Sequence, residues 1–120
     1  MEKFESLIAW QKAHQLVKEI YKTTKKFPQK ETFILIPQII RAAISIPANI
    51  VEGTKRRSIK DQSHFLNMAE ASLEEVKYYI ILAVDLSYIH REESKDLLSL
   101  SEEVGRLLSG LIRKRRNLDN

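Results

Sequence analysis

The chain has 120 residues and a net charge of +4, from 20 Lys and Arg against 16 Asp and Glu, and it contains no cysteine. This length favours one domain with one core, and the absence of cysteine excludes disulfides, thiolate catalysis and thiolate metal sites. The charge excess is too small to indicate a polyanionic partner by itself, because clustered cations matter more than the total. The amino-terminal residues mix charged with apolar side chains, unlike a signal peptide, and no run of about 18 apolar residues predicts a membrane span. We therefore expect a soluble, cytoplasmic protein.

Apolar residues recur at helical spacing in four segments, and the alternation that marks β-strands is absent. The predicted helices span residues 7–26, 37–53, 58–88 and 91–116. In the last segment a heptad seam is formed by Leu97, Leu100, Val104, Leu107 and Leu111, which Leu108 and Ile112 widen. Four amphipathic helices with short polar connections predict one all-α domain, residues 1–120, folded as an antiparallel up-and-down four-helix bundle.

The ends of the predicted helices are marked by residues with distinct backbone preferences. Pro28 disfavours helical geometry in the residue before it, so the first helix should end there. Pro37 suits the first turn of the second helix, and Gly53 suits its carboxyl-terminal end. Ser58 and Asp61 resemble a capping box, which should open the third helix.

The stretch SIPANIVEGTKRRS, residues 45–58, combines a helix breaker, polar residues and a run of cations. Pro47 lies inside the predicted second helix, where it removes one backbone hydrogen bond. Polar and small residues line up on the face of this helix away from the isoleucines, and a second polar seam occurs on the third helix. A buried carboxylate without a partner is too costly to keep. We therefore expect a structural hydrogen-bonded network, between helices or subunits, formed by Arg41, Ser45, Asn49, Glu52, Ser72 and Glu75.

Three segments, LIAWQKAHQLVKEIY, QIIRAAISIPANIVEG and FLNMAEASLEEV, carry a family resemblance. They resemble the small four-helix-bundle proteins related to those encoded in intervening sequences of bacterial 23S ribosomal RNA genes. The accessory variability proteins of diversity-generating retroelements belong to the same wider group. The resemblance implies a bundle that assembles into a ring-like homopentamer and uses basic surfaces to bind nucleic acid. The motif positions of the family correspond here to Trp10, Arg41, Ser45, Pro47, Asn49, Glu52, Gly53, Ser72 and Glu75.

Two clusters of cations are the candidates for nucleic-acid binding. They are Lys55, Arg56, Arg57 and Lys60, at the joint between the second and third helices, and Arg113, Lys114, Arg115 and Arg116, at the end of the fourth. At the joint a phosphate can meet Arg side chains and the free N–H groups of a helix start. We expect the two clusters at opposite ends of the bundle, which would give a ring of subunits two basic rims. Most aromatic residues fall on core faces, so binding should involve the nucleic-acid backbone rather than the bases.

The sequence predicts neither a metal site nor an active site. The nearest approximations to the Glu-x-x-His motif of di-iron bundles are Asp61-Gln-Ser-His64 and Ser87-Tyr-Ile-His90. No histidine has an obvious Ser or Asp partner, and the glycines are too isolated to form a phosphate-binding loop. We therefore expect no enzymatic activity, no cofactor and no small-molecule substrate.

Three functions remain open. The first is a non-enzymatic homo-oligomer, a pentamer by resemblance, that binds RNA or DNA through its cationic clusters. The second is a protein-interaction adaptor that docks onto a nucleic-acid enzyme such as a reverse transcriptase, and the third is a purely structural oligomer. Salt-sensitive binding to polyanions distinguishes the first from the other two.

Overall fold

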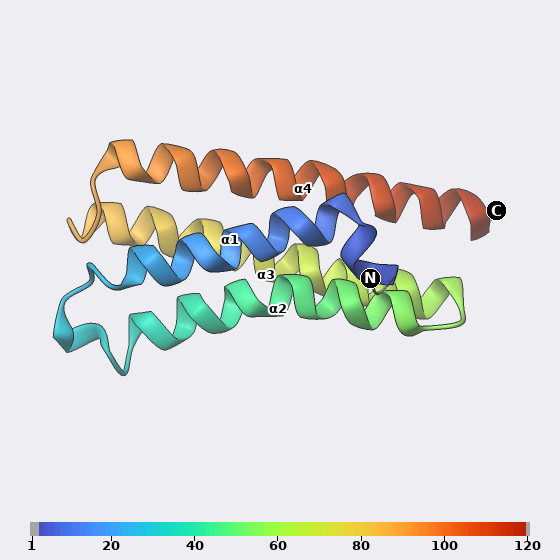
Figure 1. Cartoon of the computed structure of the whole chain (residues 1–120), viewed down its shortest axis with the longest axis horizontal. Coiled ribbons are helices and arrows are strands. Elements are labelled where there is room, and N and C mark those ends of the chain that lie inside the picture. The colour runs from blue at the N-terminus through green and yellow to red at the C-terminus, as the bar shows by residue number, and fades with distance from the viewer. Residues whose placement is uncertain (1–2, 120) are drawn as a thin grey trace.

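The computed structural model describes residues 3–119. Its long helices lie side by side, and each runs antiparallel to the one that follows it in the chain (Figure 1). In chain order they are α1 (Ile8–Thr24), α2 (Leu35–Lys55), α3 (Ile59–Asp85) and α4 (Arg91–Asp119), with two short 3₁₀ helices, η1 (Lys3–Ser6) and η2 (Gln29–Glu31). The molecule measures 47 × 24 × 24 Å. The predicted all-α, up-and-down four-helix bundle is confirmed.

The boundary between α2 and α3 follows the predicted signals only in part. Ser58 caps α3, because its Oγ accepts a hydrogen bond from the backbone N–H of Asp61 at 3.1 Å. Gly53 does not end α2, which continues to Lys55. Instead Gly53 is buried against α3, where an added Cβ would lie 3.6 Å from the Cβ of Phe65. This distance is an ordinary van der Waals contact, so the packing would also admit a Cβ at this position. The prediction of Gly53 as a helix stop is wrong.

The start of α2 is held by a side chain from the preceding connection. α2 begins at Leu35, before Pro37, and the Leu35 N–H donates to Oε1 of Glu31 at 3.4 Å. The other carboxylate oxygen of Glu31 accepts a hydrogen bond from the hydroxyl of Tyr88, in the connection between α3 and α4. This bond raises the pKa of Tyr88 above its ordinary value of 10.0. Glu31 therefore ties η2 both to α2 and to the α3–α4 connection.

All four helices contribute to a single core. Its largest fully buried apolar side chains are Leu16, Ile20, Ile39, Ile46, Ile50, Leu73, Val76, Ile80, Val104 and Leu108. These residues recur at helical spacing along each helix, as an apolar stripe facing a common interior requires. None of the helices in the described part of the chain has the length and hydrophobicity that a membrane span requires.

The buried seam of α4 differs from the predicted heptad. Leu100, Leu107 and Leu111 are only partly buried, whereas Ser94 and Ser101 are 4% and 0% exposed. Each serine hydroxyl donates to a carbonyl of its own helix, so its burial leaves no unsatisfied polar atom. The buried side of α4 is therefore formed by Leu97, Ser101, Val104, Leu108 and Ile112, whereas Leu100, Leu107 and Leu111 of the predicted seam lie at its margin.

The two predicted basic clusters lie at the same end of the bundle. In Figure 1 the α2–α3 joint and the end of α4 are both at the right, as is η1. The chain leaves this end along α3 and returns to it along α4, so the prediction of opposite ends is wrong. Arg115 Nε, near the end of α4, donates to Oε1 of Gln62, in the first turns of α3, at 3.0 Å. The bundle therefore has one basic end, and η2 and the α3–α4 connection form the other end.

Candidate nucleic-acid interface

A small polar network joins α2 to α3. Asn49 is only 9% exposed, and its side-chain nitrogen donates to the carbonyl oxygen of Ser45 at 2.8 Å and to Ser45 Oγ at 2.9 Å. Ser72 Oγ, on α3, donates to the same Ser45 Oγ at 2.9 Å. The structure therefore brings together Ser45, Asn49 and Ser72 of the predicted network.

The other predicted members lie apart from this network. Arg41 and Glu75 are exposed and line one shallow groove of about 200 Å³, but no ion pair of the described residues joins them. Glu52 is exposed, and its Oε2 accepts a hydrogen bond from Arg56 at 2.8 Å, one helical turn further along. Glu52 thus belongs to the surface near the α2–α3 joint.

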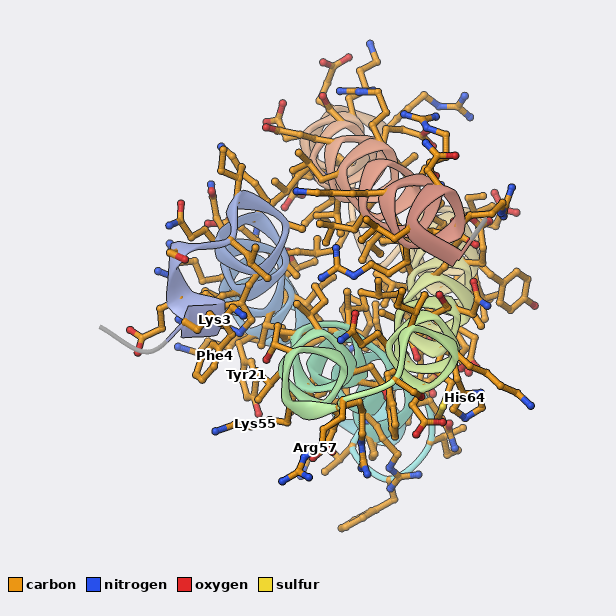
Figure 2. The ribbon with its side chains drawn as sticks, turned by 90° about the vertical axis from the view of Figure 1, so that its right-hand side faces the viewer. Lys3, Phe4, Tyr21, Lys55, Arg57 and His64 are labelled. Carbon is orange, nitrogen blue, oxygen red and sulfur yellow. The ribbon has the colours of Figure 1, made fainter. Side chains whose placement is uncertain are left out.

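We use the term basic end for the surface formed by the α2–α3 joint and the last turns of α4. Its cations are Lys55, Arg56, Arg57, Lys60, Arg113, Lys114, Arg115 and Arg116. Figure 2 looks onto this end and shows Lys55 and Arg57 pointing away from the bundle, on the side that also carries Lys3. Within residues 52–61 and 113–118 the only carboxylates are Glu52 and Asp61. Positive charge therefore dominates these segments.

Two of these arginines are fixed by contacts within the protein. Arg56 pairs with Glu52, and its guanidinium carbon lies 4.5 Å from the ring centroid of Phe65, a cation–π geometry. Arg115 bonds to Gln62, whose amide also donates to the carbonyl oxygen of Arg56 at 3.0 Å. Gln62 therefore connects the α2–α3 joint to α4 by hydrogen bonds, and both arginines are held in place by contacts within the protein.

The remaining cations of the basic end are exposed. They are Lys55, Arg57, Lys60, Arg113, Lys114 and Arg116, and none forms an ion pair with a carboxylate in the described part of the chain. Cations at the carboxyl ends of α2 and α4 are also favoured by the helix dipole, so a cluster at the end of one helix is weak evidence for a binding site. The convergence of three chain segments at one end is the more informative feature, because it concentrates charge that the sequence separates.

Gln62 and Phe65 organise this surface, and neither was among the candidate residues predicted from the sequence. Phe65 is only partly buried, and its ring lies beneath Arg56. Gln62 carries no charge and matches no motif, so only the convergence of α3 with α4 shows its role. The Arg56–Glu52 pair had a visible signal, since opposite charges four residues apart on a helix face each other.

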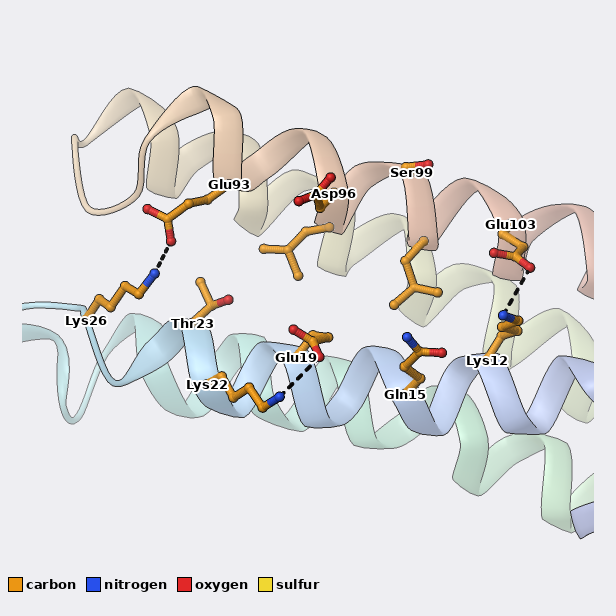
Figure 3. A pocket seen from close by; sticks show the side chains of 12 residues that line it. Lys12, Gln15, Glu19, Lys22, Thr23, Lys26, Glu93, Asp96, Ser99 and Glu103 are labelled. Carbon is orange, nitrogen blue, oxygen red and sulfur yellow. Dashed lines mark hydrogen bonds and ion pairs between the residues drawn. The ribbon is translucent and has the colours of Figure 1, made fainter.

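A second hollow runs between α1 and α4, and Figure 3 shows the charged side chains that span it. Its volume is about 630 Å³. Lys12 pairs with Glu103 at 3.5 Å, and Lys26 pairs with Glu93. The hydrogen bond from Lys26, aided by the backbone N–H of His90, lowers the pKa of Glu93 below its ordinary value. Because cations and carboxylates alternate here, this groove lacks the single sign of charge that marks the basic end.

The described residues contain no group of three or more His, Cys, Asp or Glu side chains placed to hold a metal ion. His14 stacks on Trp10 with ring centroids 4.9 Å apart, and His64 lies against Phe65 at 5.3 Å. Both histidines thus have an aromatic ring as a neighbour.

The fold and the basic end define a small helical-bundle protein with a cationic surface at one end. Residues 5–110 match the family of 23S rRNA-intervening sequence proteins, and the chain belongs to this family. The match includes the cations of the α2–α3 joint and ends before Arg113.

A solved structure supports the same relationship. It is the crystal structure of a protein of unknown function from the S23 ribosomal protein family of Bacteroides thetaiotaomicron. The two share 29% sequence identity and a TM-score of 0.79, over 88% of this chain and 98% of that one. No curated protein matches the chain.

Proposed function

We propose that this protein is a non-enzymatic homo-oligomer of the cytoplasm that binds the phosphate backbone of RNA or DNA through its basic end. The observation that carries the proposal is the convergence of Lys55, Arg57 and Lys60 with the cations of α4 on one end of the bundle. Cations without protein carboxylates nearby are free to replace the counterions of a polyanion, which is the main source of non-specific affinity.

Oligomerisation strengthens this proposal because it repeats the surface. Both clusters lie at the same end, so parallel copies in a ring would carry one continuous basic rim. Repeated weak contacts raise the overall affinity through effective concentration. The family resemblance implies five copies, and we include the pentamer in the proposal on that ground.

Recognition of the backbone rather than the bases is the expected mode. Phe65 lies beneath Arg56, and His14 covers the ring of Trp10, so the described residues show no open row of aromatic rings at the basic end. Such rows are what single-strand binding proteins use to stack bases. We therefore expect little sequence preference and a strong dependence on salt.

The test measures binding of a labelled RNA hairpin and a labelled DNA duplex at about 50 and 200 mM salt. We expect the triple variant Lys55→Ala, Arg57→Ala, Lys60→Ala to bind at least about tenfold more weakly and with a smaller salt slope. The variant Arg113→Ala, Lys114→Ala, Arg116→Ala should behave in the same way.

The matched control removes the same charge from the other end of the bundle, through Lys30→Ala, Arg91→Ala and Lys95→Ala. This variant should keep most of the affinity. An equal loss in the control, or no binding by the wild type at low salt, would contradict the proposal.

A protein-interaction adaptor is the second candidate, favoured by one specific observation. Phe33 and Ile34, beside η2, are 91% and 67% exposed. They lie at the end of the bundle opposite the basic end, in a turn held by hydrogen bonds within residues 29–34. A nucleic-acid enzyme such as a reverse transcriptase is the partner class for this candidate, and no retention by polyanions at low salt would favour it over the first. A purely structural oligomer is the remaining alternative.

A further inference from the structure

Gln62, a neutral residue in the first turns of α3, lies between the two cationic clusters of the basic end. Its side-chain nitrogen donates to the backbone carbonyl oxygen of Arg56 at 3.0 Å. Its side-chain oxygen accepts a hydrogen bond from Nε of Arg115, also at 3.0 Å. One carboxamide therefore bonds to both clusters, to the α2–α3 joint through its nitrogen and to the last turns of α4 through its oxygen.

The last turns of α4 have little else that holds them to the bundle. Within residues 3–118, Ile112 is the last buried side chain, and residues 113–118 are exposed except for the partly buried Arg115. The bond from Arg115 to Gln62 is the only side-chain hydrogen bond or ion pair that joins residues 113–118 to residues 3–112. Helix ends without tertiary contacts fray. This bond therefore determines where the cations of α4 lie relative to α3.

The α2–α3 joint is held through its backbone, which leaves its outer cations available. Gln62 bonds to the carbonyl oxygen of Arg56 rather than to a charged group. The guanidinium of Arg56 is occupied by Glu52 and by the ring of Phe65. The next residue, Arg57, is exposed and forms no ion pair with a carboxylate in the described part of the chain. The joint is thus fixed without using the cations that face solvent.

The two clusters are brought close enough to act together. At Gln62 the joint and α4 are separated by one carboxamide and two hydrogen bonds. The screening length of salt is about 8 Å at physiological ionic strength, so cations carried by segments this close can act on the same stretch of a polyanion. Simultaneous contact through both clusters binds more tightly than either contact alone, because the second contact forms at a high effective concentration. The geometry therefore favours one binding surface over two.

We infer that the two cationic clusters form one composite surface for a single stretch of phosphate backbone, and that Gln62 is the positioning residue that couples them. Gln62 carries no charge and acts through Arg115 and through the backbone of Arg56, as a supporting side chain behind the groups that contact a ligand. The inference rests on the nucleic-acid binding of the proposed function and adds the residue that makes the basic end a single site.

The first test removes both hydrogen bonds of Gln62 without changing the charge of the protein. Gln62→Met keeps nearly the same side-chain length and a similar helix propensity. Binding of a labelled RNA hairpin and a labelled DNA duplex is measured between about 50 and 200 mM salt. We expect binding about fivefold weaker than that of the wild type at the lower salt concentration. The salt slope should also be smaller, because fewer cations contact phosphates at once.

The salt slope separates positioning from a loss of folded protein. Partial unfolding would reduce the amount of active protein but leave the slope of the remainder unchanged. The matched control is Gln29→Met, the same substitution at an exposed position in η2, at the far end of the bundle. It should keep the wild-type affinity and slope. A wild-type slope in Gln62→Met would overturn the inference and leave the proposed function standing, whereas a wild type that fails to bind at low salt would overturn both.

The second test determines whether Gln62 acts through the cations of α4. Gln62→Met is combined with the triple alanine variant of α4 introduced above, and the wild type, both parents and the combination form a double-mutant cycle. Once these cations are absent, their position no longer matters, so Gln62→Met should then change the affinity by less than about twofold. The same fivefold loss in both backgrounds would refute the coupling.

A third variant breaks the contact from the side of α4 and keeps the positive charge. Lysine places a methylene where arginine has Nε, so Arg115→Lys loses the bond to Gln62. It should match Gln62→Met in affinity and in salt slope. The two substitutions together should be no more than about twofold weaker than either alone, because both break the same contact. Wild-type binding by Arg115→Lys, or additive losses, would contradict the assignment. Circular dichroism confirms in each case that the bundle is folded.

Discussion

The α2–α3 seam and the α1–α4 seam of this bundle are built in opposite ways. Between α2 and α3, Ser45 and Ser72 are close enough to share a hydrogen bond of 2.9 Å, and Gly53 packs directly on Phe65. Between α1 and α4 there is a groove of about 630 Å³ that ion pairs of long side chains span. Small residues thus give a close seam with partly buried polar contacts, and Lys and Glu give an open one. The comparison predicts that α2 and α3 carry more of the stability.

The largest expected effect is the difference between truncating a fully buried residue of α2 and truncating a partly buried residue of the α1–α4 groove. Ile46 is 0% exposed on α2, so Ile46→Ala should lower the free energy of unfolding by about 3 kcal/mol. Leu100 lines the α1–α4 groove and is only partly buried, so Leu100→Ala should cost about 1 kcal/mol. Urea unfolding followed by circular dichroism measures both, and equal costs would break the comparison.

A smaller effect is expected from the polar bridge of the close seam. Asn49→Ala removes two hydrogen bonds to Ser45 and should destabilise the protein by about 1–2 kcal/mol. Glu52→Ala, which removes an exposed pair on the same helix, should stay within about 0.5 kcal/mol and serves as the control. A double-mutant cycle of Asn49→Ala with Ser72→Ala should show coupling, because both side chains bond to the same hydroxyl. Additive costs would argue against a network.

The smallest effect concerns the open seam and is expected to depend on pH. The bond from Lys26 lowers the pKa of Glu93 below 4.5, so this pair stabilises the folded state above that pH. The contribution is lost as the pH falls through the lowered pKa of the folded state. Lys26→Gln should therefore be less stable than the wild type at neutral pH, and urea unfolding should show this difference shrinking as the pH falls through the lowered pKa of Glu93. A difference that persists in acid would assign the effect to packing instead.

The fold was predictable from the sequence because four amphipathic stripes admit few arrangements. The detail of α4 was not, since apolar periodicity selects leucines and ignores serine. Ser101 is fully buried because its hydroxyl bonds to the carbonyl of Leu97, a local bond that hydropathy does not register. The same limit applies to Gly53, which lies buried against α3 rather than at the end of a helix.

The candidate site was predictable as a set of residues but not as an arrangement. The eight cations are visible in the sequence as two clusters. Both clusters lie at one end of the bundle because α3 runs away from that end and α4 returns to it. Glu52 was assigned to the α2–α3 network because it shares a helix side with Asn49. In the structure Glu52 instead pairs with Arg56, one helical turn further along. The union of the two clusters depends on how α3 and α4 run, which only the folded chain provides. The Glu52–Arg56 pair lies within one helix, and its opposite charges four residues apart were visible in the sequence.

The position of the two termini has a practical consequence for any assay on this protein. The last described residue, Asp119, lies at the end that carries the cations, and η1 lies against α1 and α2 in the half of the bundle nearer to that end (Figure 1). An affinity tag, fluorescent fusion or sensor-chip linkage at either terminus would stand beside the surface under study and could shield it or compete with it. Attachment through Lys30→Cys in η2, at the far end of the bundle, would leave that surface open to solution.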